Sequence, residues 1–165
     1  MTQTGTKQQY GLNYWYNTIC LEAKLDKIPE AVQYFEEQIT EAKVEISVKG
    51  NLEQAASRLP GIFEYRYSQL QEIESIVEYL NIRLRKIKKE RLEYYTTKYN
   101  KQLTVREAEK YVDGDDDYVD FSYLLNYFAL VRNQFTGLIK SLDIKNWQIS
   151  NITKIRVAGI EDARI

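Results

Sequence analysis

Residues 62–98 contain neither proline nor glycine, and their apolar side chains recur at alternating steps of three and four. That spacing predicts one long helix with a single apolar face. At 1.5 Å per residue the helix spans roughly 55 Å, too long for its apolar face to be buried within one small globule. Another long helix must therefore lie beside it, from this chain or from a second copy. The predicted face consists of Leu70, Ile73, Val77, Leu80, Leu84 and Ile87.

The segment before this stretch also has a helical pattern. Residues 25–51 predict a helix that Gly50 and Asn51 can end. Beyond it, Pro60 and Gly61 are expected to interrupt the chain shortly before the long helix. The apolar face of the helix within residues 25–51 is expected to hold Val32, Phe35, Ile39, Ala42 and Ile46.

The last third of the chain predicts another long helix, which begins near Asp120 or Ser122. After residues 143–146 we expect a shorter helix, from about Trp147 to Val157. The apolar face of the long helix is predicted to contain Phe121, Leu124, Phe128, Val131, Phe135, Leu138 and Leu142.

Residues that break helices are scarce in this chain, and charged residues are common. The 165 residues include 7 glycines and 2 prolines, and 28% of them are charged. This balance favours long helices over a compact sheet protein. We therefore predict an all-α fold, a long helical hairpin with shorter flanking helices. Because long helices in a small chain leave much apolar surface uncovered, we also expect self-association.

The N-terminal residues differ in composition from the rest of the chain. Residues 1–9 are polar and are expected to be disordered, whereas residues 10–21 concentrate aromatic side chains at Tyr10 and at positions 14–16. These aromatics either dock on the body of the fold or form an exposed motif for a partner. We divide the chain into an aromatic-rich extension, residues 1–27, and a helical domain, residues 28–165.

Several classes of function are disfavoured by what the sequence lacks. It has no histidine, and its single cysteine, Cys20, permits no internal disulfide and is expected to be a small, buried or half-buried hydrophobe. No stretch resembles a secretory signal, a membrane span or a glycine-rich phosphate loop. We therefore expect an intracellular, cytoplasmic protein that is not an enzyme and that uses no cofactor and no membrane.

An acidic loop invites a calcium-binding interpretation, because Asp113, Asp115 and Asp117 occupy alternate positions. An EF-hand loop that starts at Asp113 needs glycine at its sixth position and glutamate at its twelfth, where this chain has Tyr118 and Leu124. No metal site is therefore predicted. We expect a solvated turn with Asp116 or Asp117 near a helix start, or else a loop that faces the basic region of a neighbouring subunit.

The net charge of −1 conceals two opposed poles. The basic pole, residues 83–91, has six basic side chains and Glu90, for a net charge of +5. The acidic pole, residues 106–120, has seven acids and two bases, for a net charge of −5. Such a separation indicates a surface for a charged partner more strongly than the isoelectric point does.

The basic pole is predicted to lie on the exposed side of the long helix. At 100° per residue, Lys86 and Lys89 point away from the apolar face, while Lys88 and Arg91 flank it. These charges form either an ordinary solvated helix surface or a site for a polyanion. Basic side chains bind phosphates through counterion release, and aromatic rings stack on unpaired bases. Tyr94 and Tyr95 follow directly, so single-stranded nucleic acid is the partner that the pattern favours.

Residues 89–95, Lys-Glu-Arg-Leu-Glu-Tyr-Tyr, resemble the Lys-x-Arg-Leu-x-Tyr-Tyr stretch of the UvsY-type phage recombination mediators. Residues 51–70, with their Ser-Arg-Leu-Pro run and spaced tyrosines, look like the lead-in of that family. Residues 111–152 are similar to its second half, where an acidic turn opens a long aromatic helix. The resemblance covers roughly residues 30–160. It departs at residues 96–99, where the family often has Ser-Gly and another base.

The resemblance implies an accessory factor without catalytic activity. Family contacts with single-stranded DNA fall on Lys89 and Arg91, and Lys86 and Lys88 extend them. Such a factor forms a ring-like homo-oligomer, heptameric if the resemblance holds, and interacts with a phage recombinase and with the single-stranded-DNA-binding protein that coats the strand. The alternative is a helical scaffold protein whose basic and acidic poles pair between subunits, and a weaker one is a module for acidic lipids.

Overall fold

The computed structural model describes residues 10–48 and 51–159, and in this part of the chain every regular element is helical. The all-α prediction is therefore confirmed; the expectation of disorder for residues 1–9 lies outside the described residues. Two short helical turns, η1 (Asn17–Leu21) and η2 (Leu25–Lys27), precede the second helix. The helices are α1 (Tyr14–Tyr16), α2 (Ile28–Ile46), α3 (Leu52–Thr97), α4 (Val105–Asp113) and α5 (Asp116–Val157).

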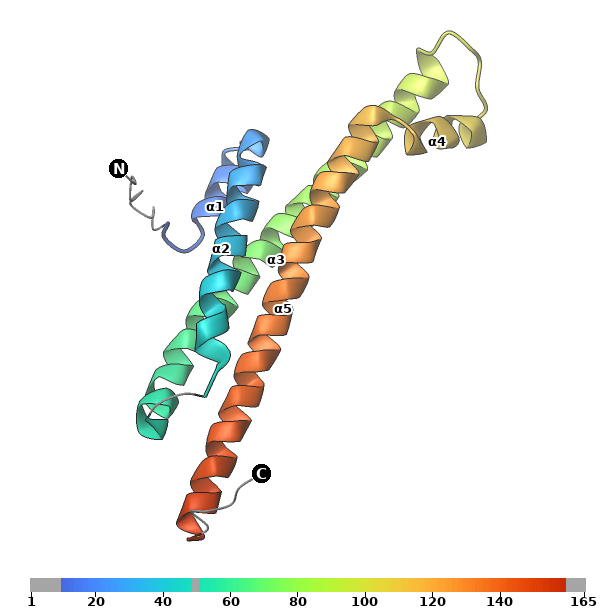
Figure 1. Cartoon of the computed structure of the whole chain (residues 1–165). Coiled ribbons are helices and arrows are strands. Elements are labelled where there is room, and N and C mark those ends of the chain that lie inside the picture. The colour runs from blue at the N-terminus through green and yellow to red at the C-terminus, as the bar shows by residue number, and fades with distance from the viewer. Residues whose placement is uncertain (1–9, 49–50, 160–165) are drawn as a thin grey trace, which may run out of the picture.

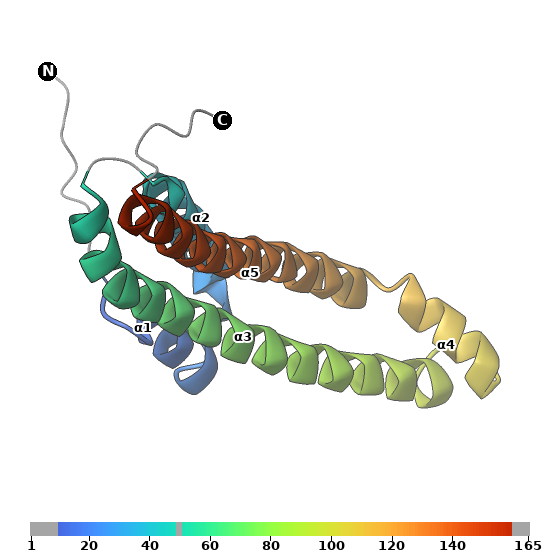
Figure 2. The ribbon, with the colours of Figure 1, turned by 90° about the horizontal axis from the view of Figure 1, so that it is seen from below.

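Helices α3 and α5 form the predicted long hairpin, running side by side in opposite directions (Figure 1). With 46 residues, α3 extends over roughly 70 Å. Helix α2 packs along α5 in the half of the hairpin that lies away from α4 (Figure 2). The short α4 joins the two long helices at the other end. One half of the rod is therefore a three-helix bundle, whereas the other consists of two helices and a short cross-connection.

The core lies where α2, α3 and α5 meet. The ring of Phe35 on α2 is fully buried, with its centroid 6.2 Å from that of Phe128 and 5.9 Å from that of Phe135. Most residues of the three predicted apolar faces are buried here, and the others are partly buried. Leu84 and Ile87, near the end of α3, are only half-buried because α2 does not extend to that end (Figure 1).

A buried arginine also joins α2 to α3. Arg66 donates hydrogen bonds from Nε and Nη2 to the two carboxylate oxygens of Glu45, at 2.8 and 2.7 Å. Its Nη1 donates to the amide oxygens of Gln38 and Gln69, each at 2.9 Å. A charge taken out of water is tolerated when it is paired and hydrogen-bonded. This network therefore fixes the alignment of α2 on α3.

The predicted interruptions of the long helices are wrong. Helix α3 runs through Pro60, which is exposed, so water can reach the carbonyl group that lacks its helical donor, while the adjacent Leu59 packs on Leu142. Helix α5 likewise starts earlier than expected, at Asp116, and runs through residues 143–146. In that stretch Lys145 is buried and donates to the backbone oxygen of Glu45 at 2.6 Å. Tertiary packing maintains both helices.

Helix α2 is shorter than predicted. It ends at Ile46, and Ser47 after it has an extended backbone. Asn51, expected to help end α2, instead caps the start of α3, where its side-chain oxygen accepts from the backbone N–H of Glu53 at 2.8 Å. An asparagine is common at both helix ends, so its position alone does not decide between them.

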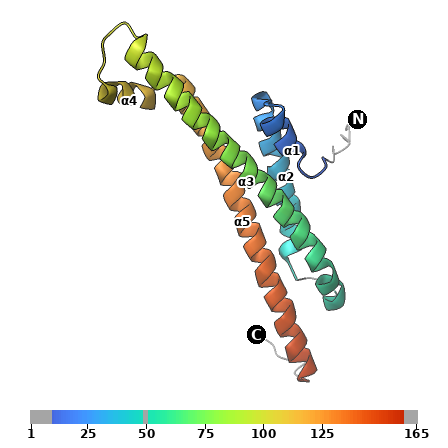
Figure 3. The same ribbon diagram turned by 180° about the vertical axis from the view of Figure 1, so that it is seen from behind.

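The aromatic segment before α2 docks on the body of the fold, as the first of the two interpretations predicted (Figure 3). Trp15 is buried in the core, and its backbone N–H and that of Tyr16 donate to Glu72 Oε1 at 2.8 and 3.0 Å. Cys20 is half-buried, and burial, followed by the negative charge of Glu72, raises the pKa of its thiol to about 11. The division of the chain at residue 27 stays a prediction.

Candidate nucleic-acid interface

The basic pole lies on the last part of α3, beyond the end that α2 covers. Lys86 and Lys89 are exposed there, as the helical spacing predicted, and Lys88, predicted to flank the apolar face, is exposed as well. Arg91 and Tyr95 are half-buried instead, because they face the connection between α4 and α5. The six predicted site residues therefore share one end of the rod but have different surroundings.

The turn between α4 and α5 places one carboxylate in the interior. Asp115 occupies the position before the first residue of α5, and its side chain is 3% exposed. Its Oδ2 accepts from Nε and Nη2 of Arg91, at 2.8 and 2.6 Å, and from the hydroxyl of Tyr95, at 2.8 Å. The contact ties the acidic turn to α3 within one chain.

The charges of this contact stabilise each other. The hydrogen bond with Asp115 raises the pKa of the Arg91 guanidinium above its ordinary value. Burial by itself would raise the pKa of the Asp115 carboxyl, but the hydrogen bonds from Arg91 and Tyr95 outweigh it, so that this pKa is lowered. Both groups are therefore ionised at neutral pH.

Two further aspartates approach the basic pole from outside. Asp113, the last residue of α4, lies 3.8 Å from Nζ of Lys88, and its side chain is 64% exposed. Asp117, in the first turn of α5, lies 3.4 Å from Nη1 of Arg91, and its side chain is 71% exposed. We call this pair the outer aspartates. Ion pairs of this kind are long and solvated, and they contribute little to stability.

Lys86 and Lys89, unlike Lys88 and Arg91, have no described aspartate beside their charged groups. Among the described residues, no carboxylate oxygen lies within 4.0 Å of either ammonium group. Arg85, also exposed, contacts Glu78 at 3.4 Å. The side of α3 that carries Lys86 and Lys89 therefore presents to solvent two lysines that form no ion pair with a described residue.

The tyrosines beyond the basic pole form a cluster rather than a free pair. The rings of Tyr95, Tyr99 and Tyr111 lie within 5.3 to 5.6 Å of one another, and the ring of Tyr94 is 5.2 Å from that of Tyr95. The Arg91 guanidinium lies 5.0 Å from the centre of the Tyr94 ring. Tyr94 and Tyr111 are the exposed members of the cluster, whereas Tyr95 is held by Asp115.

The acidic loop is a turn near a helix start, as the first interpretation of the sequence predicted, because α5 begins at Asp116. It is not fully solvated as predicted, because Asp115 is buried. The contacts that the other interpretation placed between subunits are made within one chain. The roles of Asp115 and Tyr111 were missed, since the contacts of both residues join segments far apart in the sequence. Tyr99 follows Tyr95 by four residues, and that spacing could have indicated its place in the cluster.

Comparison with known proteins identifies the class to which this all-α chain belongs. Residues 40–159 match the model of the family described as recombination, repair and ssDNA binding protein UvsY. The match covers more than half of the chain, so the chain belongs to the UvsY family. The resemblance inferred from residues 89–95 is thereby confirmed. Residues 10–39, including the docked aromatic segment, lie outside the match.

The fold is also similar to a solved structure, that of the bacteriophage T4 recombination mediator protein UvsY. The two share 17% sequence identity with a TM-score of 0.66, and the match covers 76% of this chain and 98% of the phage protein. At this identity the likeness concerns the fold alone. A search of curated proteins found no match. In the described part of the chain, no helix is long and apolar enough to cross a membrane.

Proposed function

We propose that this protein is a recombination mediator that binds single-stranded DNA along the exposed side of α3. Membership of the UvsY family supports the class of function. The observation that carries the location is that Lys86 and Lys89 are exposed without an ion-pair partner among the described residues, on the helix that also carries the exposed Tyr94. Phosphates of a strand would bind the lysines, while a base would stack on Tyr94.

The six residues of the interface have graded roles in this proposal. Lys86 and Lys89 bind phosphates directly, since neither forms an ion pair with a described carboxylate. Lys88 and Arg91 also bind phosphates, but each has an aspartate nearby. Tyr94 stacks, and Tyr95 supports the ring of Tyr94 and the side chain of Arg91.

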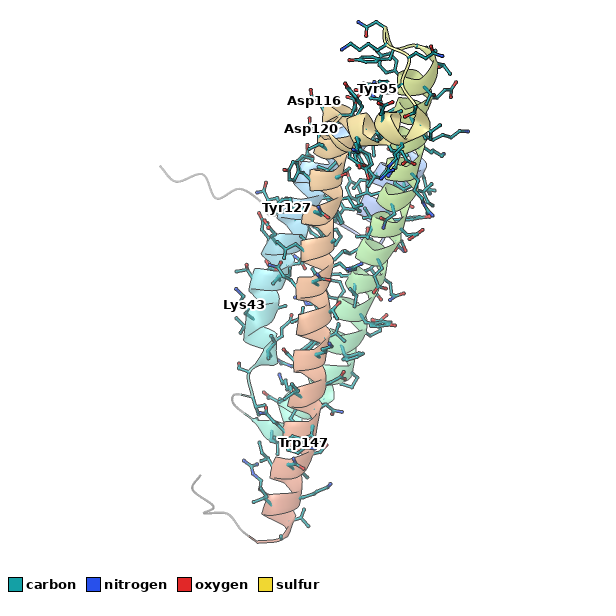
Figure 4. The ribbon with its side chains drawn as sticks, turned by 90° about the vertical axis from the view of Figure 1, so that its right-hand side faces the viewer. Lys43, Tyr95, Asp116, Asp120, Tyr127 and Trp147 are labelled. Carbon is teal, nitrogen blue, oxygen red and sulfur yellow. The ribbon has the colours of Figure 1, made fainter. Side chains whose placement is uncertain are left out.

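A single patch of this size neutralises roughly three or four phosphates, which gives only weak binding. The proposal therefore includes a ring-like homo-oligomer, heptameric as the resemblance implies, in which linked copies bind one strand with high avidity. Exposed apolar side chains along α5 support self-association (Figure 4). They include Tyr123, Tyr127, Leu130, Ile144 and Trp147.

The resemblance also suggests what the assembled protein does. It weakens the binding of the single-stranded-DNA-binding protein to the strand and nucleates filaments of the phage recombinase, without catalysing a reaction itself. This takes place in the cytoplasm of the infected host cell. The alternative, a scaffold whose poles pair between subunits, is less favoured, because Arg91 and Asp115 already pair within one chain.

Titration of labelled oligo-dT with the full chain at several salt concentrations tests the proposal. We expect Lys86→Ala combined with Lys89→Ala to weaken binding by about tenfold or more at 0.1 M salt. The slope of log K against log salt should become shallower by about 1.4, because two phosphate contacts are lost at about 0.7 each.

A matched control uses exposed lysines on other surfaces. Lys43→Ala combined with Lys140→Ala removes the same charge from α2 and α5, and should change affinity by less than about twofold. Affinity that does not respond to salt would contradict a phosphate-binding surface. An equal loss in both double variants would contradict its location on α3.

A further inference from the structure

The outer aspartates lie where bound phosphates would have to lie. Asp113 faces Lys88 and Asp117 faces Arg91, and both basic groups belong to the interface proposed above. A phosphate that approaches Lys88 or Arg91 therefore meets a carboxylate of the same chain beside each cation. The competition would depend on where these two aspartates lie, and not on the net charge of the chain.

We propose that Asp113 and Asp117 are internal competitors for the phosphates of the strand. They neutralise Lys88 and Arg91 in the free protein, and thereby set how tightly, and at what salt concentration, single-stranded DNA is held. This inference rests on the proposed function. It assigns the outer aspartates a role in tuning affinity, in addition to the direct contacts of Lys86 and Lys89.

Three aspartates near the turn have different roles. Asp115 is structural, whereas Asp113 and Asp117 can be displaced. Asp115 is buried and holds Arg91 by two short hydrogen bonds. That contact fixes the guanidinium so that Nη1 remains for Asp117, at 3.4 Å. Because Asp113 and Asp117 are exposed and more distant from their partners, a phosphate can replace them without unpacking the turn.

The position of Asp113 supports a role other than helix stability. It is the last residue of α4, the helix end at which the backbone dipole disfavours an acid. Asp117, in contrast, lies in the first turn of α5, where an acid is favoured. The contact with Lys88 offsets the unfavourable interaction of Asp113 with the helix dipole.

The space beside Arg91 can admit a ligand. A shallow hollow of about 290 Å³ opens between the end of α3 and the acidic turn. When Asp117 turns away into solvent, this hollow gives a phosphate access to Nη1 of Arg91. Its lining consists of Arg91, Tyr95, Gly114, Asp115, Asp116 and Asp117.

The test variant is Asp113→Asn combined with Asp117→Asn, titrated with labelled oligo-dT. Asparagine keeps the size of each side chain and removes its charge, so the fold should be retained, which thermal melting followed by circular dichroism checks. We expect binding about five- to tenfold tighter at 0.1 M salt. The salt slope should be steeper by about 1.4, because no displaced carboxylate then takes up cations to offset the counterions released at two phosphate contacts, at about 0.7 each.

Two acids outside this hollow provide a matched control. Asp120, near the start of α5 (Figure 4), and Asp143, further along the same helix, are exposed and make no ion pair with another described residue. Asp120→Asn combined with Asp143→Asn changes the net charge by the same amount. It should tighten binding by less than about twofold and leave the salt slope unchanged, because only the long-range field is altered.

The outcomes separate this inference from the proposed function. Equal effects of the two double variants, or no effect of the Asp113 and Asp117 variant on an otherwise salt-sensitive wild type, would overturn the inference alone. Absence of oligo-dT binding in wild type and variant alike, even at low salt, would overturn both. Binding that appears only when the outer aspartates are neutralised would support the inference in its strongest form.

Discussion

Two buried carboxylates at different places along the rod hold different parts of the molecule together. Glu72, in the middle of α3, accepts from the backbone N–H groups of Trp15 and Tyr16 and so holds the aromatic segment. Asp115, in the turn before α5, accepts from Arg91 and Tyr95 and so holds the acidic turn. Each uses one oxygen for at least two short hydrogen bonds, but only Asp115 faces a cation.

The two carboxyl groups therefore differ in the direction of their pKa shifts. Burial raises the pKa of Glu72, and the hydrogen bonds from Tyr16 and Trp15 only partly offset it. Burial acts in the same direction on Asp115, yet the hydrogen bonds from Arg91 and Tyr95 outweigh it and lower the pKa. At Glu72 the two neutral backbone donors do not outweigh the effect of burial, whereas at Asp115 a guanidinium and a hydroxyl do.

The largest effect is expected from removal of the carboxylate that faces the cation. Asp115→Ala should lower the free energy of unfolding by about 2–3 kcal/mol, because Arg91 and Tyr95 lose a buried partner. Urea denaturation of the full chain measures this change. Asp120→Ala, an exposed neighbour, should change it by less than about 0.5 kcal/mol. Similar losses in both variants would contradict a special role for Asp115.

An intermediate effect is expected from the pH dependence of Asp115. A lowered pKa means that the ionised carboxyl stabilises the fold above its ordinary value of 3.8, and that this stabilisation is lost as pH falls through the lowered pKa. The difference in unfolding free energy between wild type and Asp115→Asn should therefore be constant near pH 7 and shrink below about pH 4. A difference that grows on acidification would contradict the direction of the shift.

The part of the fold that the sequence predicts well is the part that periodicity controls. The apolar positions of residues 70–80 and 128–142 match the buried face of the hairpin, because helical spacing determines which side chains share a face. Helix ends were predicted less well. Pro60 and residues 143–146 lie inside helices, since packing of Leu59 and Lys145 on distant segments outweighs local preference.

The sequence predicted which residues the candidate interface contains, but not which of them form ion pairs with each other. The exposure of Lys86 and Lys89 follows from their position on α3, so the sequence was sufficient. The contact between Arg91 and Asp115 spans 24 positions and depends on how α4 folds back, which no local pattern encodes. Both poles could be recognised from charge alone, whereas the choice between pairing within a chain and between chains required the three-dimensional structure.

The smallest effect is expected at the carboxylate that lacks a cation. Glu72→Gln keeps an oxygen that can accept the N–H groups of Trp15 and Tyr16, so below about pH 4 the variant and wild type should differ by no more than about 1 kcal/mol. A raised pKa means that Glu72 stabilises the fold below its ordinary value of 4.5 and that this contribution is lost as pH rises through the raised pKa.

Wild type should therefore lose stability relative to Glu72→Gln between about pH 4 and pH 7, the reverse of the behaviour at Asp115. Urea denaturation of both proteins over this range measures the difference, and the fluorescence of Trp15 reports whether the aromatic segment stays docked. Since Trp147 is largely exposed, Trp147→Phe in both proteins leaves Trp15 as the sole tryptophan. A wild type that gains stability relative to the variant as pH rises would mean that the N–H groups of Trp15 and Tyr16 hold the Glu72 carboxylate as firmly as Arg91 holds that of Asp115.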